Sequence, residues 1–189
     1  MEILKRLEQY AAITWNQFVP LALVCVAMTV ILIGVDMQMG LFAGLQGKAV
    51  KSAGKLSGKI AEVLALVTVV YYCLREGYGQ VRKRHFKLSD FFAAGIRTMI
   101  RVTRLIHPLA GFIVFCLSVF HGYLFLFVGN FGMGKEIVSG IVSLIGLLSL
   151  VITGWMVYGS AQAQQIRKAH RYFGWLFVGL FLAHKVLSD

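Results

Sequence analysis

Charged residues are scarce in this chain, and acidic residues are the scarcest. Only 14% of its 189 residues are charged, and they comprise 8 acidic against 19 basic side chains. A soluble domain usually carries about 25% charged residues. The shortage of charge therefore excludes an ordinary soluble domain and points to a membrane.

Cysteine chemistry and nucleotide-binding motifs are also missing. The cysteines Cys25, Cys73 and Cys116 lie in apolar stretches and form neither a CxxC motif nor a disulfide framework. We interpret them as buried thiols that fill space. The absence of CxxCH excludes covalent haem attachment. No GxGxxG follows a strand and no phosphate-loop spacing occurs, so the sequence shows no nucleotide-binding domain.

Long apolar runs are what the chain does contain. Hydrophobic residues make up 58% of it, and the mean hydropathy is +0.75. A helix needs about 20 mostly apolar residues to cross a bilayer. We therefore predict an all-α integral membrane protein, a single domain over residues 1–189 with five transmembrane helices. The predicted spans cover residues 18–35, 60–74, 107–128, 137–158 and 170–187.

The distribution of cations predicts how the chain crosses the membrane. The net charge of +11 could indicate nucleic acid, but the cations gather at span ends, as the positive-inside rule expects. With the N-terminus inside, 13 of the 19 Lys and Arg residues lie in inner segments and six in outer ones. We predict a protein of the bacterial cytoplasmic membrane with its N-terminus inside and its C-terminus outside. Lipid is then the expected partner, and nucleic acid is not.

Two segments between the spans have helical patterns. One carries four lysines at helical spacing, which predicts a single cationic face on the outer side. These lysines are Lys48, Lys51, Lys55 and Lys59. That face is either solvated at the lipid headgroups or a docking patch for an anionic partner. The other segment, residues 90–106, predicts an amphipathic helix in the inner interface that leads into His107.

Four of the five histidines form two pairs with the same spacing. His107 and His121 are 14 residues apart, and so are His170 and His184. In a helix, 14 residues give roughly 21 Å of rise and a residual rotation of about 40°. The two members of each pair therefore share one helix face at two depths. The fifth histidine, His85, lies in a basic run, and we interpret it as a solvated residue.

The two histidine helices run in the same direction, so their histidines should face one another level by level. We predict that His107 meets His170 near the inner surface and that His121 meets His184 near the outer surface. Cofactor sites in helix bundles are built from facing helices in this way. Each facing pair could hold one haem iron by two imidazoles. That arrangement leaves no open position for substrate and suits electron transfer.

Glycines accompany the histidines at equal positions. Gly111 and Gly174 each lie four residues, about one turn, after the first histidine of their helix. A flat macrocycle against the helix needs a missing side chain there, although glycine is also common in membrane helices. Residues 137–158 carry a separate stripe of small side chains that predicts close packing against a neighbour. The stripe consists of Ser139, Ser143, Gly146 and Gly154.

Cations close to the histidines are candidates for binding haem propionates. These are Arg101, Arg104 and Arg171 on the inner side and Lys185 on the outer side. Arginine favours bidentate pairing with carboxylates. The alternative is that these cations serve only membrane topology.

With these four histidines and two glycines, residues 107–184 resemble the transmembrane domain of the ferric reductase and NADPH oxidase superfamily. They also resemble other small di-haem cytochromes b. The resemblance implies two haem b groups, the inner one reduced by a cytosolic flavoprotein or by quinol and the outer one reducing an acceptor outside. Members of the superfamily often continue into flavin and nucleotide domains, so the resemblance implies a partner subunit here.

We therefore expect a haem subunit that carries electrons across the membrane and has no substrate chemistry of its own. One alternative is a quinone-linked cytochrome b anchor of a respiratory oxidoreductase. The other is a metal-ion transporter that uses the histidines. The last three spans contain no Asp or Glu, which disfavours a path for divalent cations because such paths use carboxylates.

Overall fold

The computed structural model describes residues 15–42, 47–84, 89–129, 134–159 and 163–188. Every regular element within these ranges is a helix, so the all-α prediction is confirmed for this part of the chain. The elements are α2 (Trp15–Met39), α3 (Gly47–Lys83), α4 (Asp90–Tyr123), the short π-helix η1 (Leu124–Val128), α5 (Lys135–Gly159) and α6 (Ala163–Ser188).

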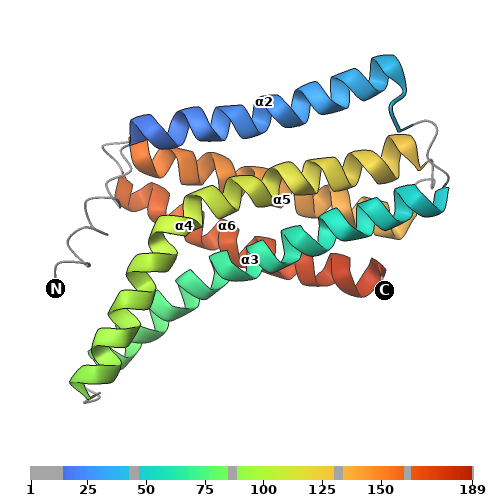
Figure 1. Cartoon of the computed structure of the whole chain (residues 1–189). Coiled ribbons are helices and arrows are strands. Elements are labelled where there is room, and N and C mark those ends of the chain that lie inside the picture. Colours follow the sequence, from blue (N-terminus) through green and yellow to red (C-terminus); the bar gives the residue numbers. More distant parts are fainter. Residues whose placement is uncertain (1–14, 43–46, 85–88, 130–133, 160–162, 189) are drawn as a thin grey trace.

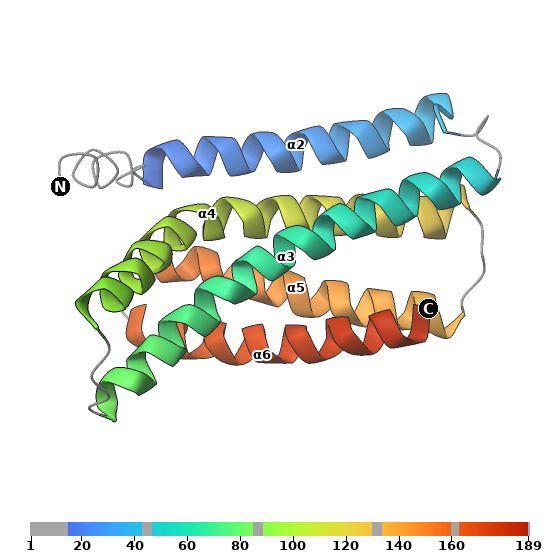
Figure 2. The same cartoon turned by 60° about the horizontal axis from the view of Figure 1, so that its bottom comes forward.

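The helices lie side by side as two hairpins with α2 along one edge (Figure 1). α3 packs along α4, and α5 packs along α6. The hairpins meet where α4 contacts α5, and α2 lies against α4, as Figure 2 shows from a second direction. In both views the end of α3 and the start of α4 project together beyond the ends of α5 and α6.

Four helices in the described ranges are long and apolar enough to cross a membrane: Ala22–Met39, Gly47–Lys83, Ile106–Val128 and Lys135–Val157. They correspond to the first four predicted spans. The fifth predicted span, residues 170–187, is helical within α6, but α6 is not one of the four. Two histidines and two cations interrupt its apolar sequence and lower its mean hydropathy. The five-span bundle therefore stays a prediction.

Two helices are longer than the sequence indicates. α3 has 37 residues and includes the lysine segment. Because the glycines of that segment have low helix propensity, the sequence did not indicate that it is continuous with the second span. α4 has 34 residues, so residues 90–106 form its first half and are not a separate helix. Pro108 lies inside α4, and α4 bends along its length (Figure 1). A proline in a helix interior can kink the helix without ending it.

Large apolar side chains cover the outside of the bundle. Met28, Val63 and Ile145 are each about three-fifths exposed, and many others are similar. An apolar surface of this extent would be unfavourable in water. Together with the four long apolar helices, it indicates that lipid surrounds the bundle.

The buried core is a single small cluster between the two hairpins. It takes one residue from each of α3, α4, α5 and α6, and we call it the apolar layer: Ala65, Val114, Leu147 and Phe177. Val114 lies midway in sequence between His107 and His121, and Phe177 lies midway between His170 and His184. The apolar layer therefore separates the two depths at which the histidines lie.

A buried carboxylate fastens the end of α2 to α4. Asp36 accepts a hydrogen bond from the hydroxyl of Tyr123 and another, at 2.6 Å, from the backbone N–H of Phe42. Asp36 is 5% exposed and Tyr123 is 7% exposed. Directly afterwards the chain enters η1, where the N–H of Gly129 donates to the carbonyl of Leu124 at 2.8 Å. Short π-helical segments are frequent at functional sites.

Candidate functional site

The structure brings together the pair His107 and His170, which we call the first level. Their ring centres lie 6.2 Å apart, and the ring planes are inclined by 88°. Imidazole nitrogens bind first-row metals at about 2 Å, so two rings on opposite sides of one metal have centres roughly 6 Å apart. The first level therefore has the spacing that a bis-imidazole site requires.

His170 is held in place by α5. Its Nδ1 lies 3.1 Å from the carbonyl oxygen of Leu150 and 3.2 Å from Oγ1 of Thr153. The ring also lies close to Gly154, where an added Cβ would come within 3.1 Å of Cε1 of the histidine. With Nδ1 engaged, His170 has Nε2 as the nitrogen for a ligand, because a metal-binding histidine usually donates its other N–H to a neighbour.

The same arrangement recurs at His184. Its Nδ1 lies 2.9 Å from Oγ of Ser139, and a Cβ on Gly140 would come within 3.2 Å of its Cε1. Ser139–Gly140 and Thr153–Gly154 are separated by 14 residues, the interval that separates the two histidines. Each hydroxyl–glycine dipeptide of α5 thus serves one histidine of α6.

α3 plays the corresponding role for α4. Nδ1 of His121 lies 2.7 Å from the carbonyl oxygen of Gly54. A Cβ on Gly58 would come within 2.9 Å of the His121 ring, too close for any alanine without a shift. The glycine carbonyl fixes the ring, and the missing side chain gives it room.

His107 differs from the other three histidines. Its Nδ1 is buried and has no hydrogen-bond partner among the described residues. The backbone of Thr68 lies beside the ring but outside hydrogen-bonding geometry, and the ring of Tyr71 lies 5.1 Å away between centres. Thr68 is 14 residues after Gly54, so α3 follows the same interval even where the bond is not made.

His121 and His184 form the second level. His121 packs against Phe125 of η1 with ring centres 4.9 Å apart. Among the described residues, the direct histidine ring contact is that of the first level. The structure thus brings the two rings of the first level together, and the pairing of His121 with His184 stays a prediction.

Two predicted propionate partners instead form ion pairs with α3. Arg171 lies 3.8 Å from the carboxylate of Glu76, and Lys185 contacts the carboxylate of Glu62. Glu62 and Glu76 are again 14 residues apart. One ion pair therefore ties α6 to α3 at each level.

The other predicted site residues are less closely involved. A Cβ on Gly111 would meet no atom within 4 Å, and one on Gly174 would make only ordinary contact with Leu150 at 3.9 Å. Arg104 is exposed on α4, and Arg101 lines a hollow between α3 and α4. His85 lies outside the described residues.

The sequence analysis missed most of the residues that hold the histidines. The small-residue stripe on α5 was predicted to allow close packing, and it does, because Ser143 donates to the backbone carbonyl of Leu180 at 3.0 Å. Its further role, holding His184 through Ser139 and giving room to His170 at Gly154, was not foreseen. The signal was present as the repeated hydroxyl–glycine dipeptide at the histidine interval.

No group of three or more His, Cys, Asp or Glu side chains that could hold a metal ion occurs in the described part of the chain. A bare cation normally needs several protein ligands. Haem iron takes only its axial ligands from the protein, so two histidines per level suffice for it. No protein-family model, curated protein or solved structure matches the chain.

Proposed function

We propose that the protein is a membrane cytochrome b that carries electrons through two haem b groups, one at each level. The observation that carries the proposal is the 14-residue interval shared by all four helices of the two hairpins. The interval separates the two histidines of α4 and also the two histidines of α6. It separates the two hydroxyl–glycine dipeptides of α5 that contact the α6 histidines. On α3 it separates the backbone groups beside the α4 histidines and the two carboxylates that pair with α6. Two equivalent sites are best explained by two copies of one cofactor.

The residues at each level fit a haem. His107 with His170 would hold one iron, and His121 with His184 the other. A haem bound in this way supplies a reversible one-electron couple whose potential depends on its axial ligands and surroundings. The hydrogen bonds to Nδ1 of three histidines fix the ring orientation and the tautomer. Two histidines at each level would hold the iron and leave it no position for substrate, which favours electron transfer over substrate chemistry.

The spacing suits a path across a membrane. Levels separated by 14 helical residues lie roughly 21 Å apart along the axis, within a hydrocarbon thickness of about 30 Å. For this path α6 is the fifth span, with its cations neutralised by the glutamates of α3. The end of the bundle that carries most cations then faces the cytoplasm, by the positive-inside rule.

The full-length protein, expressed with ample haem supply, tests the proposal directly. We expect a Soret band, sharp α and β bands on reduction, and two haems per chain by pyridine haemochrome. Alanine variants of His107 or His170 should lose the first-level haem, and variants of His121 or His184 should lose the second-level haem. His85→Ala is the matched control and should keep both.

A colourless protein under these conditions, or four variants that all retain full haem, would overturn the assignment. Transport of zinc into vesicles that contain such a colourless protein would instead favour the transporter alternative.

The electron donor is a separate part of the proposal. By resemblance to ferric reductases and NADPH oxidases, we propose a cytosolic flavoprotein supplied by a partner subunit, with quinol as the alternative donor. Reduction by a flavoprotein in quinone-free nanodiscs would support the first. A requirement for quinol, together with sensitivity to quinone-site inhibitors, would support the anchor subunit of a respiratory oxidoreductase.

A further inference from the structure

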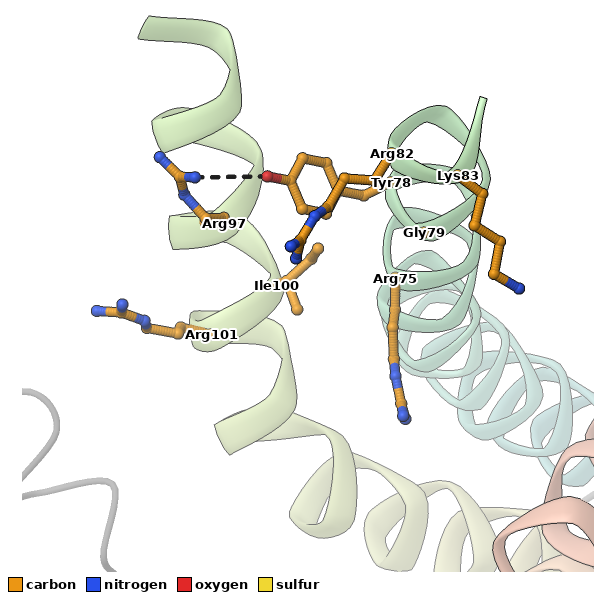
Figure 3. A pocket seen from close by; sticks show the side chains of 8 residues that line it. All are labelled: Arg75, Tyr78, Gly79, Arg82, Lys83, Arg97, Ile100 and Arg101. Atoms are coloured by element: carbon orange, nitrogen blue, oxygen red, sulfur yellow. Dashed lines mark hydrogen bonds between the residues drawn. The ribbon is translucent and has the colours of Figure 1, made fainter. Parts of the chain in front are cut away.

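A basic hollow of about 570 Å³ lies between the projecting end of α3 and the beginning of α4 (Figure 3). No histidine lines it, and it has no part in the proposed electron path. Its lining consists of Arg75, Tyr78, Gly79, Arg82, Lys83, Arg97, Ile100 and Arg101. We refer to it below as the basic hollow.

The lining is strongly charged and of one sign. Five of its eight residues are cations, and no Asp or Glu is among them. Arg97 is oriented by the hydroxyl of Tyr78, 3.5 Å away, and Arg82 reaches from α3 toward α4 beside Ile100 (Figure 3). In Figure 3 the side chains of Arg75, Lys83 and Arg101 extend outward, whereas Arg82 of α3 and Arg97 of α4 lie beside the same space. An anion placed there would relieve their mutual repulsion.

The end of the basic hollow nearest the apolar spans would lie at the depth of lipid headgroups, and the hollow extends outward from there. On α3 its lining begins at Arg75, directly after the apolar stretch that ends at residue 74. On α4 it ends at Arg101, five residues before the apolar span Ile106–Val128. Five residues of helix rise about 7.5 Å, and the headgroup layer extends about 5–8 Å beyond the hydrocarbon on each side.

We propose that the basic hollow binds the phosphate headgroup of an anionic phospholipid from the adjacent leaflet. Basic pockets between transmembrane helices on the cytoplasmic side are suited to such headgroups. Arg82 and Arg97 contact the phosphate, and Ile100 gives the glycerol an apolar wall. Gly79 leaves the floor open, since a Cβ there would meet no atom within 4 Å. The proposal rests on the membrane-spanning helices and is independent of haem.

Native mass spectrometry of the full-length protein tests this site with defined lipids. The probes are phosphatidylglycerol and phosphatidylcholine with identical acyl chains, titrated into delipidated protein in detergent. We expect phosphatidylglycerol to bind preferentially. Arg82→Gln and Arg97→Gln should each weaken its binding about fivefold, the effect of removing one cation near anionic lipid. Gly79→Leu should weaken it as much by filling the hollow without changing charge.

Two variants serve as matched controls. Gly77→Leu adds the same side chain to the same helix, also where a Cβ would meet nothing within 4 Å. Arg84→Gln removes one exposed cation just beyond α3 that does not line the hollow. Both should bind phosphatidylglycerol as the unchanged protein does, and circular dichroism confirms that all variants remain helical.

Equal affinity for the two lipids, or equal losses in the hollow and control variants, would overturn the proposal. Glycerol 3-phosphate separates the two sources of a phosphate group. If it displaces phosphatidylglycerol at similar concentration, the basic hollow is a site for soluble phosphates and the lipid assignment is wrong. Failure of glycerol 3-phosphate to compete supports the lipid.

Discussion

The four histidines differ in how firmly their Nδ1 atoms are held. His184 bonds to Ser139, and His170 bonds to both Thr153 and the carbonyl of Leu150. His107 has a buried Nδ1 without a partner in the described residues. Partners of this kind orient a ligand and strengthen its bond to the metal. The two levels, similar in plan, should therefore differ in how tightly they retain haem.

Ser139→Ala should weaken haem retention at the second level. It removes the hydroxyl at Nδ1 of His184, and loss of such a partner typically costs about 10- to 100-fold in affinity for the bound metal group. Thr153→Val should have a smaller effect at the first level, because the carbonyl of Leu150 still accepts from His170. Haem transfer to apomyoglobin measures both. Ser149→Ala is the control, since that hydroxyl bonds only within α5, to Ile145. Equal haem loss in the Ser149 and Ser139 variants would count against this role.

Gly58→Ala should lower the melting temperature and disturb the second level. The new Cβ would lie 2.9 Å from His121, and overpacking of this kind costs about 1–3 kcal/mol. The alanine regains up to about 1 kcal/mol in helix propensity, so the net change is smaller than the strain. Gly179→Ala, where a Cβ meets nothing within 4 Å, should be neutral or stabilising. Thermal unfolding followed by circular dichroism distinguishes the two, and a melting temperature in the Gly58 variant no lower than in the control contradicts the close contact.

At the scale of helices, α6 depends on polar contacts as well as on its packing against α5. Its two ion pairs with α3 join helices from different hairpins. Trp175 of α6 also donates a hydrogen bond to the hydroxyl of Tyr72 of α3 at 3.2 Å, at a position in the sequence between the two ion pairs. The same charges that lower the hydropathy of α6 are thus the groups that attach it to the bundle.

Glu62→Gln should destabilise the protein more than Glu76→Gln. Glu62 is in close contact with Lys185, and its side chain is 27% exposed, whereas Glu76 lies 3.8 Å from Arg171 and is 44% exposed. A less exposed ion pair is screened less by solvent. The double variant Glu62→Lys with Lys185→Glu should recover most of the loss, because it restores the pair with its charges exchanged. Melting temperatures in detergent check this order, and a double variant no more stable than Glu62→Gln would show that the pair itself does not matter.

The sequence predicts some of these helices well and others poorly. The histidine interval predicts four imidazoles on two helices at two depths, and the structure brings the first of the two predicted pairs, His107 and His170, together. The lysine segment and the span at residues 60–74 were predicted separately, whereas the structure joins them in α3. Gly54 and Gly58 have low helix propensity, yet their lack of side chains is what admits Phe125 and His121. Single-helix patterns cannot show a role that depends on the neighbouring helix. The ion pair between Lys185 and Glu62 was not predicted for the same reason.

At the scale of the whole molecule, the four helices of the two hairpins form the same arrangement twice, once at each level. Each level has two histidines, a polar group from each flanking helix beside them, and one ion pair between α3 and α6. The apolar layer lies between the levels, and none of its four side chains can carry a proton. Hydrocarbon side chains therefore make up the buried cluster between the two levels.

If the proposed haems carry electrons past the apolar layer, that layer should impede ions while electrons pass. An electron that moved between the levels would then take no proton with it, so its transfer should be electrogenic and work with or against the membrane voltage. Moving one charge across the full membrane changes its energy by about 2.3 kcal/mol per 100 mV, and the two levels span most of that distance. In proteoliposomes, an imposed potassium-diffusion potential should shift the balance of reduced haem between the levels, and valinomycin without a gradient should not. A balance that ignores the voltage would mean that a compensating ion crosses the layer after all.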